Sequence, residues 1–202
     1  LSFLLFALST YPLFGAAEDV LDPVVDIAGE DLQTDALYYV LPYIWALGGG
    51  VGLGRNWNGS ICPFSVVQSP FEVNDGSPVK FSPILDEDSV IRVSTDIDIS
   101  FIRAPRLCSD LPIWQISDLF VTLGGTGGSI IDRFRIVKHN VSPFLPTYKI
   151  VFCKARMTCQ NIGIFNKNGI RYLALSGEPY IVVFKKDQLS QIRKVTDGHK
   201  IY

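Results

Sequence analysis

Short runs in which hydrophobic and polar residues alternate recur along most of the chain, and they predict β-strands rather than helices. Asp96–Phe101 alternates strictly between polar and apolar side chains, which is the period of two of a half-buried strand. The other runs are four or five residues long and rich in β-branched and aromatic residues, which favour strands. They cover residues 38–41, 65–68, 90–94, 114–117, 119–122, 134–137, 148–152, 162–165, 171–175 and 180–184.

Turn-forming sequences separate these runs. Gly and Asn, which supply the positive φ that tight turns need, cluster at residues 48–50, 74–76, 124–128 and 166–169. Only the stretch from about residue 187 to 193 could hold a helical turn. The pattern predicts an all-β protein of about ten to twelve short strands, arranged as a sandwich or a closed barrel.

The first 17 residues differ in character from the rest of the chain. Residues 1–17 carry no charge and end in Gly15-Ala16-Ala17, a small-residue site typical of signal-peptide cleavage. Pro12 interrupts this run, which is shorter than the roughly 20 apolar residues of a membrane span. We therefore expect residues 1–17 to be part of a signal peptide, residues 18–186 to form one domain, and residues 187–202 to be a charged C-terminal tail.

Composition and charge narrow the class of protein. Hydrophobic residues make up 48% of the chain, which is enough for a substantial core, and the formal net charge is -2. Without a basic field, a nucleic-acid partner is not expected. We expect a monomer with no membrane partner once the signal peptide is removed.

Four cysteines indicate disulfide bonds. Cys62 and Cys108 are far apart in the chain, whereas Cys153 and Cys159 are close together. No histidine lies near any of them in the sequence, which argues against a zinc site, so we expect two disulfides and no metal. Three pairings of four cysteines exist. Because disulfides persist only in oxidising compartments, the chain is expected to be secreted or vacuolar.

Two N-glycosylation sequons fit the same compartment. They are Asn58-Gly59-Ser60 and Asn140-Val141-Ser142. Each asparagine is a candidate for a glycan if it lies on an exposed loop, and an unmodified asparagine is equally compatible with the sequence.

No enzyme motif is present in the sequence. It contains no nucleophile elbow, no phosphate-binding loop, no dinucleotide fingerprint and no zinc-protease motif. The two histidines, His139 and His199, have no neighbours that suggest a general base. Asp96 and Asp98 fall on one side of a strand, where a solvated face explains them, and residues 86–88 indicate an exposed loop tip. We therefore expect no catalytic residue, no cofactor and no enzymatic activity.

A series of segments is similar, in order, to one known family. Val24–Leu32 and the following Tyr38-Tyr39-Val40 resemble its N-terminal signature, with Ala28 where a polar residue is usual. Further similar segments are 48–50, 62–63, 66–68, 91–96, 148–153, 161–164, 171–175 and the segment around Trp114. On these segments the chain, from about residue 22 to 186, is identified as a member of the Kunitz-type soybean trypsin inhibitor family of plants, which includes miraculin-like proteins.

The resemblance implies a fold, a disulfide pairing and a partner. It implies a β-trefoil, a six-stranded barrel capped by three hairpins, with the pairs Cys62–Cys108 and Cys153–Cys159. It also implies that one exposed, substrate-like loop binds a serine protease and blocks its active site. Such an inhibitor does no chemistry of its own and needs no cofactor.

By similarity, the reactive loop contains Pro83, Ile84, Leu85, Asp86, Glu87 and Asp88. Two registers are open: either Leu85 or Asp86 enters the primary pocket of the protease, and we prefer Leu85. The loop has no Lys or Arg for trypsin, whose pocket ends in a carboxylate, so a hydrophobic slot as in chymotrypsin or subtilisin is the better match.

The residue at position 34 bears on whether the protein is an inhibitor or a non-inhibitory member of the family. Thr34 aligns with an asparagine whose side chain braces the loop in the family's best inhibitors. Threonine lacks the two-donor amide, and the loop itself is acidic. These departures keep open a non-inhibitory miraculin-like role in storage, stress response or carbohydrate binding.

Overall fold

The computed structural model describes residues 21–85, 88–105, 107–108, 111–154 and 158–188. These residues form strands β1 (Tyr38–Pro42), β2 (Val51–Gly54), β3 (Ser65–Gln68), β4 (Val79–Pro83), β5 (Ile97–Phe101), β6 (Trp114–Ser117), β7 (Phe120–Leu123), β8 (Asp132–Lys138), β9 (Tyr148–Lys154), β10 (Gln160–Lys167), β11 (Ile170–Ser176) and β12 (Ile181–Lys186), and the 3-10 helix η1 (Trp45–Leu47). The predicted signal peptide, residues 1–17, and all but the first two residues of the predicted tail, 187–202, lie outside the described part.

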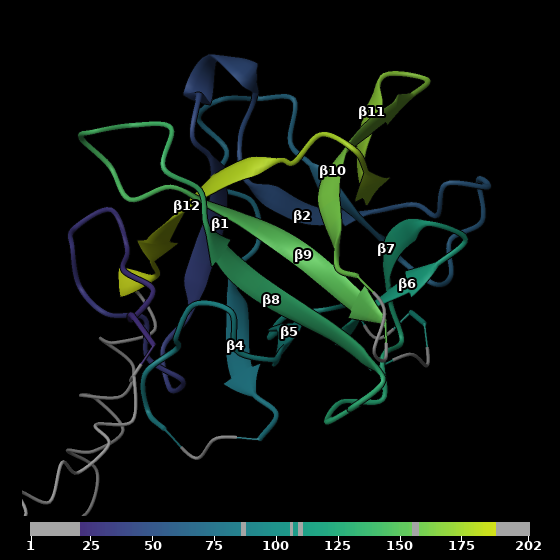
Figure 1. Cartoon of the computed structure of the whole chain (residues 1–202). Helices are drawn as coiled ribbons and strands as arrows, with labels where there is room; N and C mark the ends of the chain where they lie inside the picture. Colours follow the sequence, from purple (N-terminus) through teal and green to yellow (C-terminus); the bar gives the residue numbers. More distant parts are fainter. Residues whose placement is uncertain (1–20, 86–87, 106, 109–110, 155–157, 189–202) are drawn as a thin grey trace, which may run out of the picture.

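Six of the strands close into a barrel (Figure 1). They pair antiparallel in the order β1, β4, β5, β8, β9 and β12, and β12 returns to pair with β1. The remaining strands form three hairpins, β2–β3, β6–β7 and β10–β11. The second strands of these hairpins pair with one another at one or two positions each. The predicted β-trefoil, a six-stranded barrel capped by three hairpins, is confirmed.

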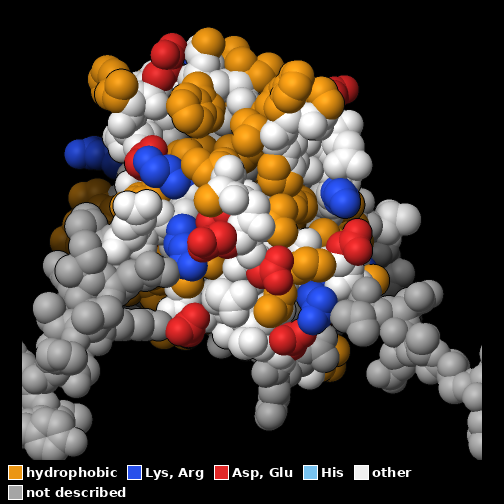
Figure 2. Space-filling view, turned by 90° about the vertical axis from the view of Figure 1, so that its left-hand side faces the viewer, with side chains coloured by type: hydrophobic (Ala, Val, Ile, Leu, Met, Phe, Trp, Pro, Cys, Tyr) orange, Lys and Arg blue, Asp and Glu red, His pale blue; other side chains and the backbone are white. Residues whose placement is uncertain are grey.

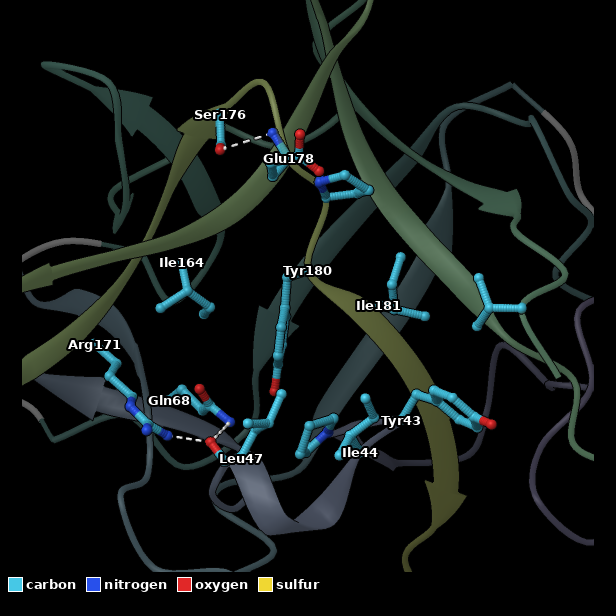
Figure 3. A pocket seen from close by; sticks show the side chains of 13 residues that line it. Tyr43, Ile44, Leu47, Gln68, Ile164, Arg171, Ser176, Glu178, Tyr180 and Ile181 are labelled. Atoms are coloured by element: carbon cyan, nitrogen blue, oxygen red, sulfur yellow. Dashed lines mark hydrogen bonds between the residues drawn. The ribbon is translucent and has the colours of Figure 1, made fainter.

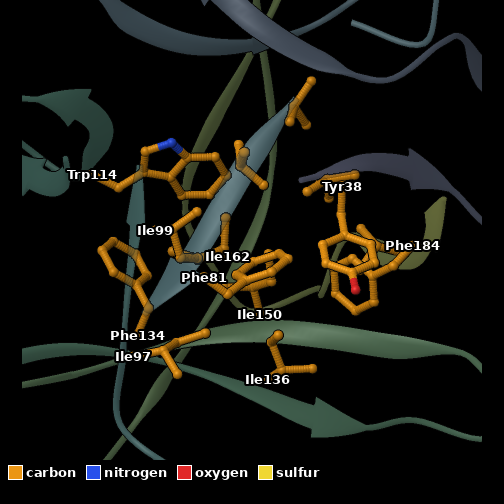
Figure 4. Packing of buried hydrophobic residues seen from close by; sticks show 14 of the residues in the cluster. Tyr38, Phe81, Ile97, Ile99, Trp114, Phe134, Ile136, Ile150, Ile162 and Phe184 are labelled. Atoms are coloured by element: carbon orange, nitrogen blue, oxygen red, sulfur yellow. The ribbon is translucent and has the colours of Figure 1, made fainter. Parts of the chain in front are cut away.

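Aromatic and aliphatic side chains from the strands fill the interior (Figure 4). Ile97, Ile99 and Phe101 are buried at alternate positions of β5, as the sequence pattern predicts. Phe81 and Phe184, from β4 and β12, meet edge to face with their ring centroids 5.3 Å apart. Burying each such side chain stabilises the fold by about 1.5–3 kcal/mol.

Two disulfides, one long-range and one local, cross-link the described part of the chain. Cys62 is bonded to Cys108, 46 positions along the chain, and Cys153 to Cys159, 6 positions along. This is the pairing that the resemblance implies. From the reduced entropy of the unfolded chain, the long bridge should stabilise the fold by about 4 kcal/mol and the short one by about 2 kcal/mol.

One predicted strand is wrong and two real ones were not predicted. Val90–Ser94 forms only isolated bridges, Gln33 with Val90 and Pro23 with Arg92, and Ser94 has a φ of 60°, which ends the extended stretch. The unpredicted strands are β2, which is half glycine, and β4, which ends in proline. Glycine and proline are uncommon in strands, so the sequence does not indicate β2 or β4, although both pair with neighbouring strands in the structure.

Candidate functional site

A long connection joins β4 to β5 at one end of the barrel, at the lower edge of Figure 1. Pro83, the last residue of β4, pairs with Ile97, and the amide of Ile84 then donates to the carbonyl oxygen of Asp96 at 3.0 Å. The next side chain, Leu85, is 73% exposed. The predicted loop residues Asp86 and Glu87 lie outside the described residues. The backbone of Pro83 and Ile84 is therefore held by the sheet, and the side chain of Leu85, the next residue, points into solvent.

The exposed Leu85 is available to a partner. A leucine gains about 1.5–3 kcal/mol when it moves from water into an apolar environment. Since β4 holds the residues before it, a partner would bury this side chain without first ordering the backbone on that side.

On the other side of residues 86–87, Asp88 holds the segment that leads back toward β5. Its carboxylate accepts a hydrogen bond from the amide of Val90 at 3.1 Å and from Nε of Arg92 at 2.8 Å. The Val90 amide, and after it the Arg92 guanidinium, lowers the pKa of Asp88. Asp88, predicted as part of an acidic tip, is thus a local brace within the loop.

The N-terminal segment supports the same side of the loop. The amide of Thr34 donates to the carbonyl oxygen of Ser89 at 2.8 Å, and the amide of Ile91 donates to that of Leu32, also at 2.8 Å. The side chains of Leu32 and Ile91 are both fully buried. Thr34, the predicted bracing residue, therefore contacts the loop through its main chain, a contact that does not depend on the identity of its side chain.

A tight turn shapes this N-terminal segment. Oδ1 of Asp26 accepts the amides of Ala28 at 2.8 Å and Glu30 at 3.0 Å, and Gly29 takes a positive φ of 81°. The Asp and Gly of the N-terminal signature are therefore needed for the turn itself. Ala28 contributes its main-chain amide while its side chain is exposed, so its departure from the usual polar residue leaves the turn intact.

Two buried tyrosines hold the segment against the barrel. The hydroxyl oxygen of Tyr38 accepts the amide of Gln33 at 2.8 Å, and that of Tyr148 accepts the amide of Val25 at 2.9 Å. Burial raises the pKa of both phenols, so both stay neutral at physiological pH. Sequence reasoning placed these tyrosines on strands and missed this role.

Asp96 anchors the other side of the loop. Its carboxylate lies 2.6 Å from Nη1 of Arg133 and 2.5 Å from Nε of Arg135, both on β8, and its side chain is only 9% exposed. The expectation of a solvated face at this position is wrong, because a neighbouring barrel strand covers it with two arginines. Asp98 accepts the amide of Gly128 at 2.6 Å and so fixes the turn before β8.

The asparagines of both sequons lie at the surface. Asn58 and Asn140 are both exposed. Oδ1 of Asn58 accepts the amide of Ser60 at 2.9 Å, which folds the first sequon into an Asx turn.

The arrangement suits binding more than chemistry. Within the described residues, no group of three or more His, Cys, Asp or Glu side chains could hold a metal ion. In the described part of the chain, no helix is long and apolar enough to span a membrane. The site combines two segments with hydrogen-bonded backbones, one on each side of residues 86–87, with the exposed apolar side chain of Leu85.

Comparison with known proteins shows the family to which this chain belongs. The profile of the legume Kunitz family, described as trypsin and protease inhibitor, matches residues 24–186. The chain is 36% identical over 185 residues to Kunitz trypsin inhibitor 5 of Arabidopsis thaliana, covering 84% of this chain and 88% of that one. It is 34% identical over 203 residues to miraculin of Synsepalum dulcificum, covering 90% and 91%. A solved complex of porcine pancreatic trypsin with soybean trypsin inhibitor contains a chain of similar fold, with a TM-score of 0.70, 28% identity and coverage of 82% and 99%.

Proposed function

The chain belongs to the legume Kunitz family of protease inhibitors, which are not enzymes, and on this premise we propose that it inhibits a serine protease with an apolar primary pocket. The observation that carries the proposal is Leu85. Its side chain is 73% exposed, next to an amide fixed on the edge of the barrel.

In the proposed mechanism, residues Pro83–Asp88 occupy the active site as a substrate would. Leu85 enters the primary pocket, and the peptide bond after it faces the protease nucleophile. Because the barrel holds Ile84 and the N-terminal segment holds Ser89, the loop loses little conformational entropy on binding. If the bond is cut, the same hydrogen bonds keep the new chain ends together, which favours resealing over release.

The chemistry of the loop favours a hydrophobic slot over trypsin. Kunitz inhibitors bind serine proteases, as the soybean inhibitor does in its complex with trypsin. Here no Lys or Arg stands between Pro83 and Asp88 to meet the carboxylate of a trypsin pocket. An acidic residue in that pocket would meet like charge and lose several kcal/mol, whereas Leu85 fits a chymotrypsin- or subtilisin-like slot.

Other properties of the chain follow the same proposal. Two disulfides suit a secreted or vacuolar inhibitor. We place N-linked glycans at Asn58 and Asn140 as candidates, and we propose a monomer, since a single loop suffices to bind one protease.

A second candidate is a non-inhibitory, miraculin-like protein with a storage, stress-response or carbohydrate-binding role. The match to miraculin over 90% of the chain supports it. So do the acidic residues that follow Leu85 and the threonine at position 34.

Inhibition assays with the disulfide-bonded protein distinguish the two candidates. Trypsin, chymotrypsin, elastase and subtilisin would be titrated with the wild type and with Leu85→Gly. Sub-micromolar inhibition of chymotrypsin or subtilisin, lost in Leu85→Gly, supports the proposal. Inhibition of none of the four would favour the non-inhibitory candidate, and tight inhibition of trypsin would contradict the assignment of Leu85.

A further inference from the structure

A pocket of about 540 Å³ opens beside η1 (Figure 3). In Figure 1, η1 and the β4–β5 connection lie at opposite ends of the barrel. The pocket lies between η1, the end of β1 and the beginning of β12, with β3, β10 and β11 behind it. Its volume falls in the range of about 300–1,000 Å³ that small-molecule sites occupy. Nothing in the inhibitory mechanism uses it.

The walls of this pocket are apolar and partly aromatic. The apolar lining comes from Pro42, Tyr43, Ile44, Leu47, Val141, Ile164, Pro179, Tyr180 and Ile181. Ile44 and Leu47 are 52% and 56% exposed, and Figure 2 shows hydrophobic side chains gathered at the corresponding upper end of the molecule. A concentration of exposed apolar side chains around a hollow is typical of a binding site rather than of ordinary surface.

Hydrogen-bond donors gather at one end of the pocket. The hydroxyl of Tyr180 is buried and has no hydrogen-bond partner in the described part of the chain. Arg171 donates from Nη1 to the carbonyl oxygen of Leu47, and none of the ion pairs among the described residues includes its guanidinium. Nε2 of Gln68 donates to the same carbonyl at 3.2 Å. Figure 3 shows the Tyr180 hydroxyl directed toward this end.

Among these donors, the Tyr180 hydroxyl lacks an acceptor within the described residues. A buried hydroxyl without a partner is uncommon in native proteins and costs about 1–3 kcal/mol. Burial raises the pKa of Tyr180, so its hydroxyl stays protonated and able to donate. A neighbouring guanidinium adds a positive charge, which favours an anionic acceptor. Glu178 lies at the other end of the pocket in Figure 3 and disfavours an anion there.

We propose that this pocket binds a small carboxylic acid with an apolar, ring-containing body. The carboxylate accepts from the Tyr180 hydroxyl and from free nitrogens of Arg171. The body lies between flat faces supplied by Tyr43, Pro179 and their aliphatic neighbours. The proposal is independent of the inhibitory function, because pocket and loop lie at opposite ends of the barrel.

Calorimetric titration with 1-naphthoic acid tests the proposal, with 1-naphthalenemethanol as its uncharged counterpart. We expect saturable binding of the acid that is at least about tenfold tighter than that of the alcohol. Arg171→Gln should weaken binding of the acid about ten- to a hundredfold, and Tyr180→Phe about tenfold. Binding of the alcohol should change little in either variant.

Arg103→Gln serves as the matched control for Arg171→Gln, because it removes an exposed arginine that does not line the pocket. This variant should bind the acid as the wild type does.

A thermal melt separates ligand binding from a structural role of the hydroxyl. Tyr180→Phe should leave the Tm of the free protein unchanged or raise it, since it removes an unsatisfied buried group. A lowered Tm without a change in affinity would mean that an ordered water satisfies the hydroxyl, and the proposal would be overturned. Absence of saturable naphthoate binding, or equal binding of acid and alcohol, would also overturn it.

Discussion

Replacing Asp96 by asparagine removes the charge that anchors one side of the proposed reactive loop. In the wild type, its carboxylate contacts Arg133 and Arg135 while its carbonyl oxygen accepts the amide of Ile84. Asp96→Asn preserves the size of the side chain but leaves the two guanidinium groups without this carboxylate. We therefore expect both a less stable barrel and a looser loop.

The size of the effect follows from burial. Removing one partner of a fully buried ion pair costs about 3–5 kcal/mol. The side chains of Arg133 and Arg135 remain 17% and 31% exposed, so solvent screening reduces the cost to about 2–3 kcal/mol. For a domain of this size, Tm should fall by about 4–12 °C. Ordering one extra loop residue costs about 1–2 kcal/mol, which weakens inhibition about five- to thirtyfold.

Differential scanning fluorimetry and inhibition constants against the most sensitive protease would measure the two effects, together with the rate at which that protease cuts the loop. Asp98→Asn is the control, because the same substitution two residues along the chain leaves an oxygen to accept the Gly128 amide. If Asp96→Asn lowers Tm but changes neither the inhibition constant nor the cleavage rate, Asp96 does not position the loop, and the reasoning is refuted.

Three further predictions address the N-terminal segment, the acidic residue of the loop and the first sequon. Tyr148→Phe leaves the amide of Val25 without an acceptor, so the free energy of unfolding in urea should fall by about 1–3 kcal/mol; an unchanged value would contradict the role of the hydroxyl. Folding lowers the pKa of Asp88 from its usual 3.8, so its stabilising contribution is complete above pH 3.8 and is lost as the pH falls through the lowered pKa. The stability difference between wild type and Asp88→Asn should therefore be constant from neutral pH to 3.8 and vanish in stronger acid; a difference that persists there would exclude this carboxylate as the cause. In protein from a eukaryotic secretory host, glycosidase treatment should lower the mass of the wild type by one glycan more than that of Asn58→Gln; equal mass losses would show that this asparagine is unmodified.

Much of the fold was predictable because its strands carry local signals. The alternation at Ile97, Ile99 and Phe101 corresponds to three buried side chains on one face of β5. Asn168 and Gly169 both adopt positive φ, 53° and 78°, in the hairpin between β10 and β11, as their types favour. Such features depend on a few consecutive residues, so a sequence pattern shows them.

The supports of the loop could not be predicted in the same way, because they join distant parts of the chain. Tyr148 reaches Val25 across 123 positions, and Asp96 reaches Arg133 and Arg135 across 37 and 39. An aspartate at an alternating position of a strand fits a solvated face equally well. Only the neighbouring strand, β8, decides that Asp96 is covered by arginines instead.

The central claim is that Leu85 fills the primary pocket of the protease, and exchanging it for arginine tests this most directly. Inhibition constants of wild type and Leu85→Arg would be measured against chymotrypsin, subtilisin and trypsin. The account predicts that Leu85→Arg gains inhibition of trypsin by at least about a hundredfold and loses inhibition of chymotrypsin by a similar factor, because trypsin's pocket ends in a carboxylate and chymotrypsin's is apolar. If the exchange alters neither constant, Leu85 does not enter the pocket and the account is contradicted.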